Sequence, residues 1–180
     1  MRASRTPRQL RPCILPPRAT DLPGRAIYPA KVEPPEEEAI RKLILLVVAG
    51  DVSQRETWLS RLEQAAEHYD SSTGYLILGM IFNDEIYAER NLNKSAMYFK
   101  RSAELGVPVA QYNVGALLAE QGEKYEAMCW LMKAIYGGYD GISSFDEFTR
   151  EFSIEEVTRI EEAVAAGDEP CEVIGRRFQE

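Results

Sequence analysis

Residues 74–138 contain two versions of one pattern. GYLILG at 74–79 precedes KSAMYFKRSAELG at 94–106, and AQYNVG at 110–115 precedes YEAMCWLMKAIYG at 125–137. The two glycines that end the first halves are 36 residues apart, whereas the matches in the second halves are 31 apart: Ala96/Ala127, Phe99/Trp130, Ala103/Ala134 and Gly106/Gly137. The second version is therefore five residues shorter between its halves. Self-similarity at this period predicts stacked pairs of helices.

Two glycines of this pattern, Gly79 and Gly115, lie inside apolar helical segments. Glycine in a helix costs about 1 kcal/mol relative to alanine, so its use at two equivalent positions predicts a close approach between helices. The second helix of each pair is expected to face these glycines with small side chains, those of Ala96, Ala103, Ala127 and Ala134. Phe99 and Trp130 are expected to fill the space between layers. Gly106 and Gly137 are expected to end the second helix of each pair.

The segment before the repeats predicts one further helix pair. Glutamates at 36–38 favour a helix start, and the first helix is expected over 36–49, ending at Gly50. Ser53 and Glu56 have the spacing of a capping box for the second helix. Its apolar residues resemble a degenerate repeat, because Leu59, Leu62 and Ala66 precede Ala96, Phe99 and Ala103 by 37 residues.

After Gly138 the repeat pattern stops. Two more capping boxes, Ser144/Glu147 and Ser153/Glu156, predict a short helix at 145–151 and a longer one at 154–166. The longer helix has one apolar stripe that is expected to cover the end of the stack: Ile154, Val157, Ile160, Ala163 and Val164. Residues 171–178 are expected to add a last turn.

The N-terminal 35 residues hold most of the prolines and little hydrophobic periodicity. Because proline removes a backbone donor, this part is expected to be a disordered arm. Residues 1–32 carry seven Arg and Lys against one Asp, or +6, whereas residues 33–180 carry 14 against 28, or −14. A transit peptide and a basic docking arm are the alternatives.

This charge distribution bears on partners and location. A strongly acidic folded part argues against binding to nucleic acid or anionic membranes. The longest apolar run, residues 43–49, is far shorter than the ~20 residues that span a bilayer. A cytoplasmic location is expected, with organelle import through residues 1–32 as the alternative.

The residues that usually carry chemistry form no recognisable site. His68 is the only histidine, and Cys13, Cys129 and Cys171 are far apart without a CxxC motif, so neither a zinc site nor a disulfide framework is expected and a reducing compartment fits best. The loop 83–93 lacks the ligand order of a calcium-binding EF-hand. The sequence predicts no enzyme activity, no cofactor and no metal.

The pattern Ala-x-x-x-hydrophobic-Gly, followed by Ala-x-x-aromatic-x-x-x-Ala-x-x-Gly, resembles the Sel-one-like repeat, a relative of the tetratricopeptide repeat. The resemblance covers residues 74–138 well and the segment before them weakly. It implies a protein-binding scaffold or adaptor in which the first helices of the pairs line a concave groove.

The fold class expected is therefore all-α: a short right-handed α-solenoid of antiparallel helix pairs. Its parts are a disordered arm (1–35), a repeat stack (36–138, with repeats at 36–70, 74–106 and 110–138) and C-terminal capping helices (139–180). The predicted role is non-catalytic binding of a protein or peptide by a monomer or small assembly. The candidate groove residues are Tyr75, Met80, Asn83, Gln111, Asn113 and Glu120. The alternatives are an immunity-type inhibitor that masks a toxin or effector, and an organelle assembly or chaperone factor.

Overall fold

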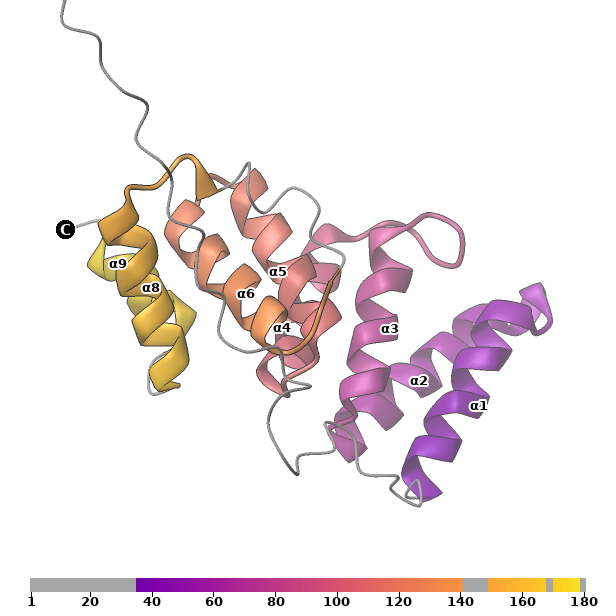
Figure 1. Ribbon diagram of the computed structural model, residues 1–180. Helices are drawn as coiled ribbons and strands as arrows, with labels where there is room; N and C mark the ends of the chain where they lie inside the picture. Colours follow the sequence, from indigo (N-terminus) through magenta and orange to yellow (C-terminus); the bar gives the residue numbers. More distant parts are fainter. Residues whose placement is uncertain (1–34, 141–148, 168–169, 179–180) are drawn as a thin grey trace, which may run out of the picture. The chain divides into compact units, whose positions relative to one another are not determined.

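The computed structural model describes residues 35–140, 149–167 and 170–178, and every regular element in these ranges is a helix (Figure 1). The elements are α1 (Pro35–Ala49), the 3₁₀ turn η2 (Val52–Gln54), α2 (Arg55–Tyr69), α3 (Ser72–Asn83), α4 (Leu92–Glu104), α5 (Pro108–Glu120), α6 (Lys124–Tyr136), α8 (Ile154–Ala166) and α9 (Cys171–Arg177). The predicted all-α class is confirmed for this part of the chain. The predicted arm, except Pro35, and most of the predicted helix at 145–151 lie outside the described residues.

The helices pack mainly against their neighbours in sequence. α1 packs against α2, α3 against α4, and α5 against α6, and the pairs are joined by α2–α3 and α4–α5 contacts. At the C-terminal end, α8 and α9 both pack against α6 (Figure 1). The three predicted helix pairs and the two C-terminal helices therefore exist as expected, with adjacent pairs in contact.

Polar side chains start several of the helices. The side chains of Ser71 and Asn91 accept hydrogen bonds from the third residues of α3 and α4, at 3.0 Å each. The capping box at Ser153 is confirmed, because its hydroxyl accepts from the Glu156 amide at 3.2 Å while the Glu156 carboxylate accepts from the Ser153 amide at 2.7 Å.

The predicted capping box at Ser53 is wrong. The carboxylate of Asp51 instead accepts a hydrogen bond from the Ser53 amide at 2.9 Å and starts the turn η2. α2 then begins at Arg55 without a side-chain cap. Asp51 lies two residues before Ser53, and an aspartate at this spacing commonly closes a local turn. The Asp51 hydrogen bond is therefore formed in place of the predicted Ser53 cap.

The structure corrects the register of the repeat. α4 and α6 have the same length and begin 32 residues apart, and each is followed by a glycine in the left-handed region, Gly106 (φ 84°) and Gly138 (φ 91°). Gly137 ends α6 as its C-cap, as expected, but with a right-handed φ of −72°, and the left-handed residue is Gly138. The second repeat is therefore four residues shorter than the first, not five.

The same register identifies α2 as the third copy. Asp70, at φ 47°, stands 36 residues before Gly106 and ends α2 in the same left-handed conformation. The positions that correspond in α2, α4 and α6 are all buried: Leu59/Ser95/Ala127, Leu62/Tyr98/Trp130 and Ala66/Ser102/Ala134. The spacing of 37 residues expected from the sequence is thus one too long.

Close packing at the two helical glycines is confirmed, although not with the expected alanines alone. A Cβ on Gly79 would lie 2.5 Å from Cδ1 of Phe99, and one on Gly115 would lie 2.8 Å from Cγ of Leu131. Phe99 and Leu131 are 32 residues apart, so they occupy the same repeat position and each packs against the glycine of its own helix pair. Ala127 also takes part, because its carbonyl oxygen would lie 3.1 Å from the Gly115 Cβ. The glycines therefore make room mainly for large side chains of the partner helix.

The buried side chains form two clusters, and α4 contributes to both. Tyr98 belongs to the N-terminal cluster with residues of α1, α2 and α3, whereas Phe99 belongs to the C-terminal cluster with residues of α5, α6, α8 and α9. In α8, Ile160 and Val164 are buried as expected, but Ile154 is 77% exposed. Ile154 is the first residue of α8 and lies outside the apolar stripe.

A disulfide joins Cys129 of α6 to Cys171 of α9, with 5.6 Å between the two Cα atoms. The expectation of no disulfide is therefore wrong. The two cysteines are 42 residues apart and match no short motif, so only the packing of α9 on α6 brings them together.

Candidate functional site

The predicted groove residues separate into buried and surface positions. Tyr75 and Gln111, which are 36 residues apart and occupy the same repeat position, are buried with 3% and 8% exposure. The Tyr75 ring stacks on Tyr98 with centroids 6.2 Å apart, and the Gln111 amide donates to the Ala103 carbonyl at 3.3 Å. Both side chains point to α4, so their assignment to an open groove is wrong.

The other four candidates reach the surface. Met80 and Asn83 are exposed on α3, and Glu120 is exposed at the end of α5. Asn113 is partly exposed, and its amide donates to the carbonyl of Val109 one turn earlier at 2.8 Å. The structure thus retains a candidate surface on the first helices of the pairs.

Corresponding positions of α1 are also exposed, and these were not predicted from the sequence. The buried pairs Ile40/Tyr75 and Val47/Phe82 show that α1 and α3 correspond with a spacing of 35 residues. At the same spacing, Leu45 corresponds to Met80 and Val48 to Asn83; Leu45 and Met80 are 65% and 51% exposed. We call Leu45, Val48, Met80 and Asn83 the α1–α3 surface. It carries no charge, and aligning α1 with α3 would have revealed it.

A second feature is a hollow of about 750 Å³ between α2 and the segment that joins α3 to α4. Two of its charged side chains, those of Lys94 and Glu63, form an ion pair with each other. Lys94 pairs with Glu63 at 2.9 Å and lies 4.6 Å from the centre of the Phe82 ring. The guanidinium of Arg55 donates to the Val47 carbonyl at 3.2 Å. These contacts join α2 to α4 and to α1.

The Glu63 carboxylate also accepts a hydrogen bond from the Tyr98 hydroxyl at 2.9 Å. Burial, together with this neighbouring carboxylate, raises the pKa of Tyr98 above its usual value. The phenol therefore remains a neutral donor at physiological pH and acts as a structural group.

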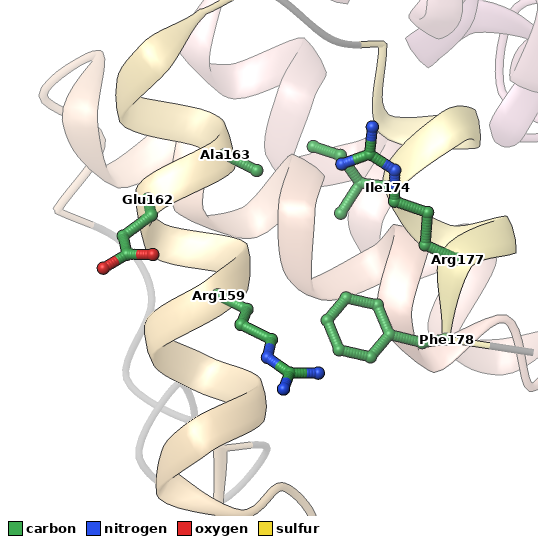
Figure 2. Close-up of a pocket in the computed structure, with 6 residues that line it drawn as sticks. All are labelled: Arg159, Glu162, Ala163, Ile174, Arg177 and Phe178. Atoms are coloured by element: carbon green, nitrogen blue, oxygen red, sulfur yellow. The ribbon is translucent and has the colours of Figure 1, made fainter.

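A third feature is a hollow of about 620 Å³ between α8 and α9, lined by Arg159, Glu162, Ala163, Ile174, Arg177 and Phe178 (Figure 2). Arg159 of α8 and Arg177 of α9 line it together with the apolar side chains of Ala163, Ile174 and Phe178. We call it the α8–α9 hollow.

Residues near the disulfide form a charged cluster. The Lys100 ammonium of α4 forms an ion pair with the Glu172 carboxylate of α9. Its hydrogen bond lowers the pKa of Glu172 and raises that of Lys100. Burial, followed by the charge of Glu172, raises the pKa of Glu126. The cluster and the disulfide together hold α9 against α4 and α6.

Replacing Glu172 with glutamine is expected to lower the stability at pH 7 by no more than about 1 kcal/mol, because the pair is partly exposed. The folded-state pKa of Glu172 is lowered, so its contribution is present above the unfolded-state pKa and is lost as the pH falls through the folded-state value. Urea midpoints of wild type and E172Q should therefore differ at pH 7 and converge at an acidic pH below the folded-state pKa of Glu172. E38Q, which removes a more exposed pair with Lys42, should shift the midpoint less. An equal loss for E172Q at both pH values would contradict the ion pair.

His68 is exposed near the end of α2, and its ring contacts only Tyr69 edge-on at 4.7 Å among the ring contacts found in the described residues. Within 35–140, 149–167 and 170–178, no group of three or more acidic, histidine or cysteine side chains could hold a metal ion. In the same ranges, no helix is long and apolar enough to cross a bilayer.

Comparison of the chain with protein-family models, with curated proteins and with solved structures finds no match.

Proposed function

We propose that this protein is a non-catalytic interaction module that binds an apolar segment of another protein through the α1–α3 surface. The observation that carries this proposal is the pair of large apolar side chains, Leu45 and Met80, exposed at corresponding positions of two helices. Val47 and Phe82, two residues further along each helix, are buried and supply the core contacts, so the repeat itself does not need positions 45 and 80 to be apolar.

The wider architecture proposed is a short right-handed α-solenoid, as the resemblance to the Sel-one-like repeat implies. Three helix pairs with the same buried positions, joined by contacts between adjacent pairs, support it. In such a stack the first helices of successive pairs lie on one side, which places α1, α3 and α5 along a common concave face.

The chemistry of the surface indicates the kind of partner. The folded part of the chain is strongly acidic, whereas the α1–α3 surface is uncharged. Leu45 and Met80 are large apolar side chains exposed at corresponding positions. They favour a partner segment that presents apolar residues, such as the apolar face of an amphipathic helix. Asn83 and, further along, Asn113 can supply hydrogen bonds at the edge of the contact.

The test compares two methionines of similar exposure. Met80 lies on the proposed surface, and Met97, with 48% exposure against 51%, lies on α4 outside it. A photo-crosslinking residue at each position identifies the partner in native extract, and the purified partner is then titrated against M80E and M97E. M80E is expected to weaken binding about tenfold or more, as for a central interface residue, while M97E leaves the affinity within about twofold. Equal affinities for the two variants, or no partner at position 80, would overturn the proposal.

The identity of the partner separates the more specific roles. A secreted or injected toxin would indicate the immunity-type inhibitor, and an organelle protein or its assembly intermediate would indicate the assembly factor.

The disulfide bears on the compartment. Structural disulfides form and persist in oxidising compartments and are rare in the reducing cytosol. We therefore propose an oxidising compartment for the folded protein, against the cytoplasmic location expected from the sequence, because Cys129 and Cys171 are bonded and fully buried.

A further inference from the structure

We propose that the α8–α9 hollow binds a small organic anion with an apolar body, of the class of aromatic or branched aliphatic carboxylates. The proposal concerns helices other than those of the α1–α3 surface and does not depend on it. It rests on the combination of an apolar wall, the guanidinium of Arg159 and a volume of about 620 Å³, which lies within the range of about 300–1,000 Å³ typical of ligand pockets.

The wall of the hollow is apolar and fixed in place. Ile174 is 1% exposed and belongs to the C-terminal cluster, against which Ala163 also packs. The Phe178 ring stacks on Tyr125 with centroids 4.8 Å apart and planes 10° apart. A ring held on one face by another aromatic offers a preformed surface to a flat or branched apolar group.

The charges of the hollow favour an anion. Arg159 of α8 and Arg177 of α9 both line the hollow, and Arg177 also takes part in another interaction, so Arg159 is the arginine expected to meet the ligand. Figure 2 shows the Arg159 side chain extending toward the Phe178 ring and the Arg177 side chain extending beside Ile174. The Glu162 carboxylate points away from both in the same view, although the residue lines the hollow.

Arginine is suited to this role because its planar guanidinium can donate two parallel hydrogen bonds to one carboxylate. An arginine beside an aromatic ring therefore recognises a ligand in which an acidic group is attached to an apolar body.

The test uses 8-anilinonaphthalene-1-sulfonate, an aromatic anion whose fluorescence rises on transfer to an apolar site. Its neutral analogue N-phenyl-1-naphthylamine has the same aromatic body without the charge. The full chain is titrated with both probes, and bound sulfonate is displaced with 3-phenylpropanoate. The variants are Arg159→Met, which removes the guanidinium, and Arg176→Met, which makes the same charge change on α9 at a residue that does not line the hollow.

The expected result is saturable 1:1 binding of the sulfonate and its displacement by the carboxylate. R159M should weaken the sulfonate about tenfold or more, the effect of losing one charge-assisted hydrogen-bond donor. R176M and M80E should leave it unchanged, and the neutral analogue should bind wild type and R159M alike. Unchanged melting temperatures for the variants show that the fold is retained. Non-saturable binding, or equal sulfonate affinities of R159M and R176M, would overturn the proposal.

Discussion

Replacing both Cys129 and Cys171 with alanine is expected to lower the free energy of unfolding by about 4 kcal/mol, the value for closing a loop of this length in the unfolded chain. The bond links residues that are 42 positions apart, so it restricts a long segment of the unfolded chain. α9 has seven residues, and a helix of this length is not stable by itself in water. Its position therefore depends on the disulfide, the Lys100–Glu172 pair and the buried Ile174.

Urea unfolding of the oxidised protein, the reduced protein and the C129A/C171A variant measures this effect. The reduced protein and the C129A/C171A variant should both unfold at clearly lower urea concentrations than the oxidised protein. C13A should unfold at the same urea concentration as wild type, because it leaves the disulfide intact. Thiol titration of the unfolded chain should find one thiol before reduction and three after it, since the chain has three cysteines. A midpoint that reductant does not move, with three thiols present throughout, would show that the bond does not form.

Replacing Phe99 with alanine is expected to cost about 3–5 kcal/mol, the range for removing a buried aromatic side chain from a core. Phe99 is 3% exposed, belongs to the C-terminal cluster and contacts the backbone of α3 at Gly79. Its loss would leave a cavity between α3 and α4, at the position that Leu131 fills between α5 and α6. Denaturant unfolding measures the loss.

The glycine opposite Phe99 provides the control for this prediction. Gly79→Ala alone should cost about 1–3 kcal/mol, because its Cβ would lie 2.5 Å from the Phe99 ring. In the double variant the methyl group enters the space that the ring has left, so the combined cost should be smaller than the sum of the two. Additive costs would mean that Gly79 is not placed there to admit the ring.

The sequence indicated the helix pairs because Gly79 and Gly115 interrupt apolar segments at the same place. It misplaced the register by one residue because the alignment matched alanines. The residues that correspond to Ala127 and Ala134 are Ser95 and Ser102. Both serines are buried and donate hydrogen bonds at 2.8 Å to carbonyls of α3, those of Gly79 and Ser72. A small residue is needed at these positions, and either alanine or serine meets that need.

The site was harder to predict from the sequence. Tyr75 and Gln111 look like surface residues when one helix is considered alone, and only the packing of α4 buries them. Leu45 lies in an apolar run with Val47, and the sequence does not show which of the two faces the core. The α8–α9 hollow and the disulfide depend on contacts between segments far apart in sequence, which no local pattern encodes.

The two consecutive residues Tyr98 and Phe99 have a consequence for how the protein unfolds. Each belongs to a different buried cluster, and both are carried by the same turn of α4. Any fluctuation that unwinds this turn removes an aromatic side chain from both clusters at once. Repeat proteins gain cooperativity from such shared elements. We therefore expect the N-terminal and C-terminal helices to unfold as one cooperative unit. A cut before or after α4 would leave one of the two fragments without an aromatic side chain of its core.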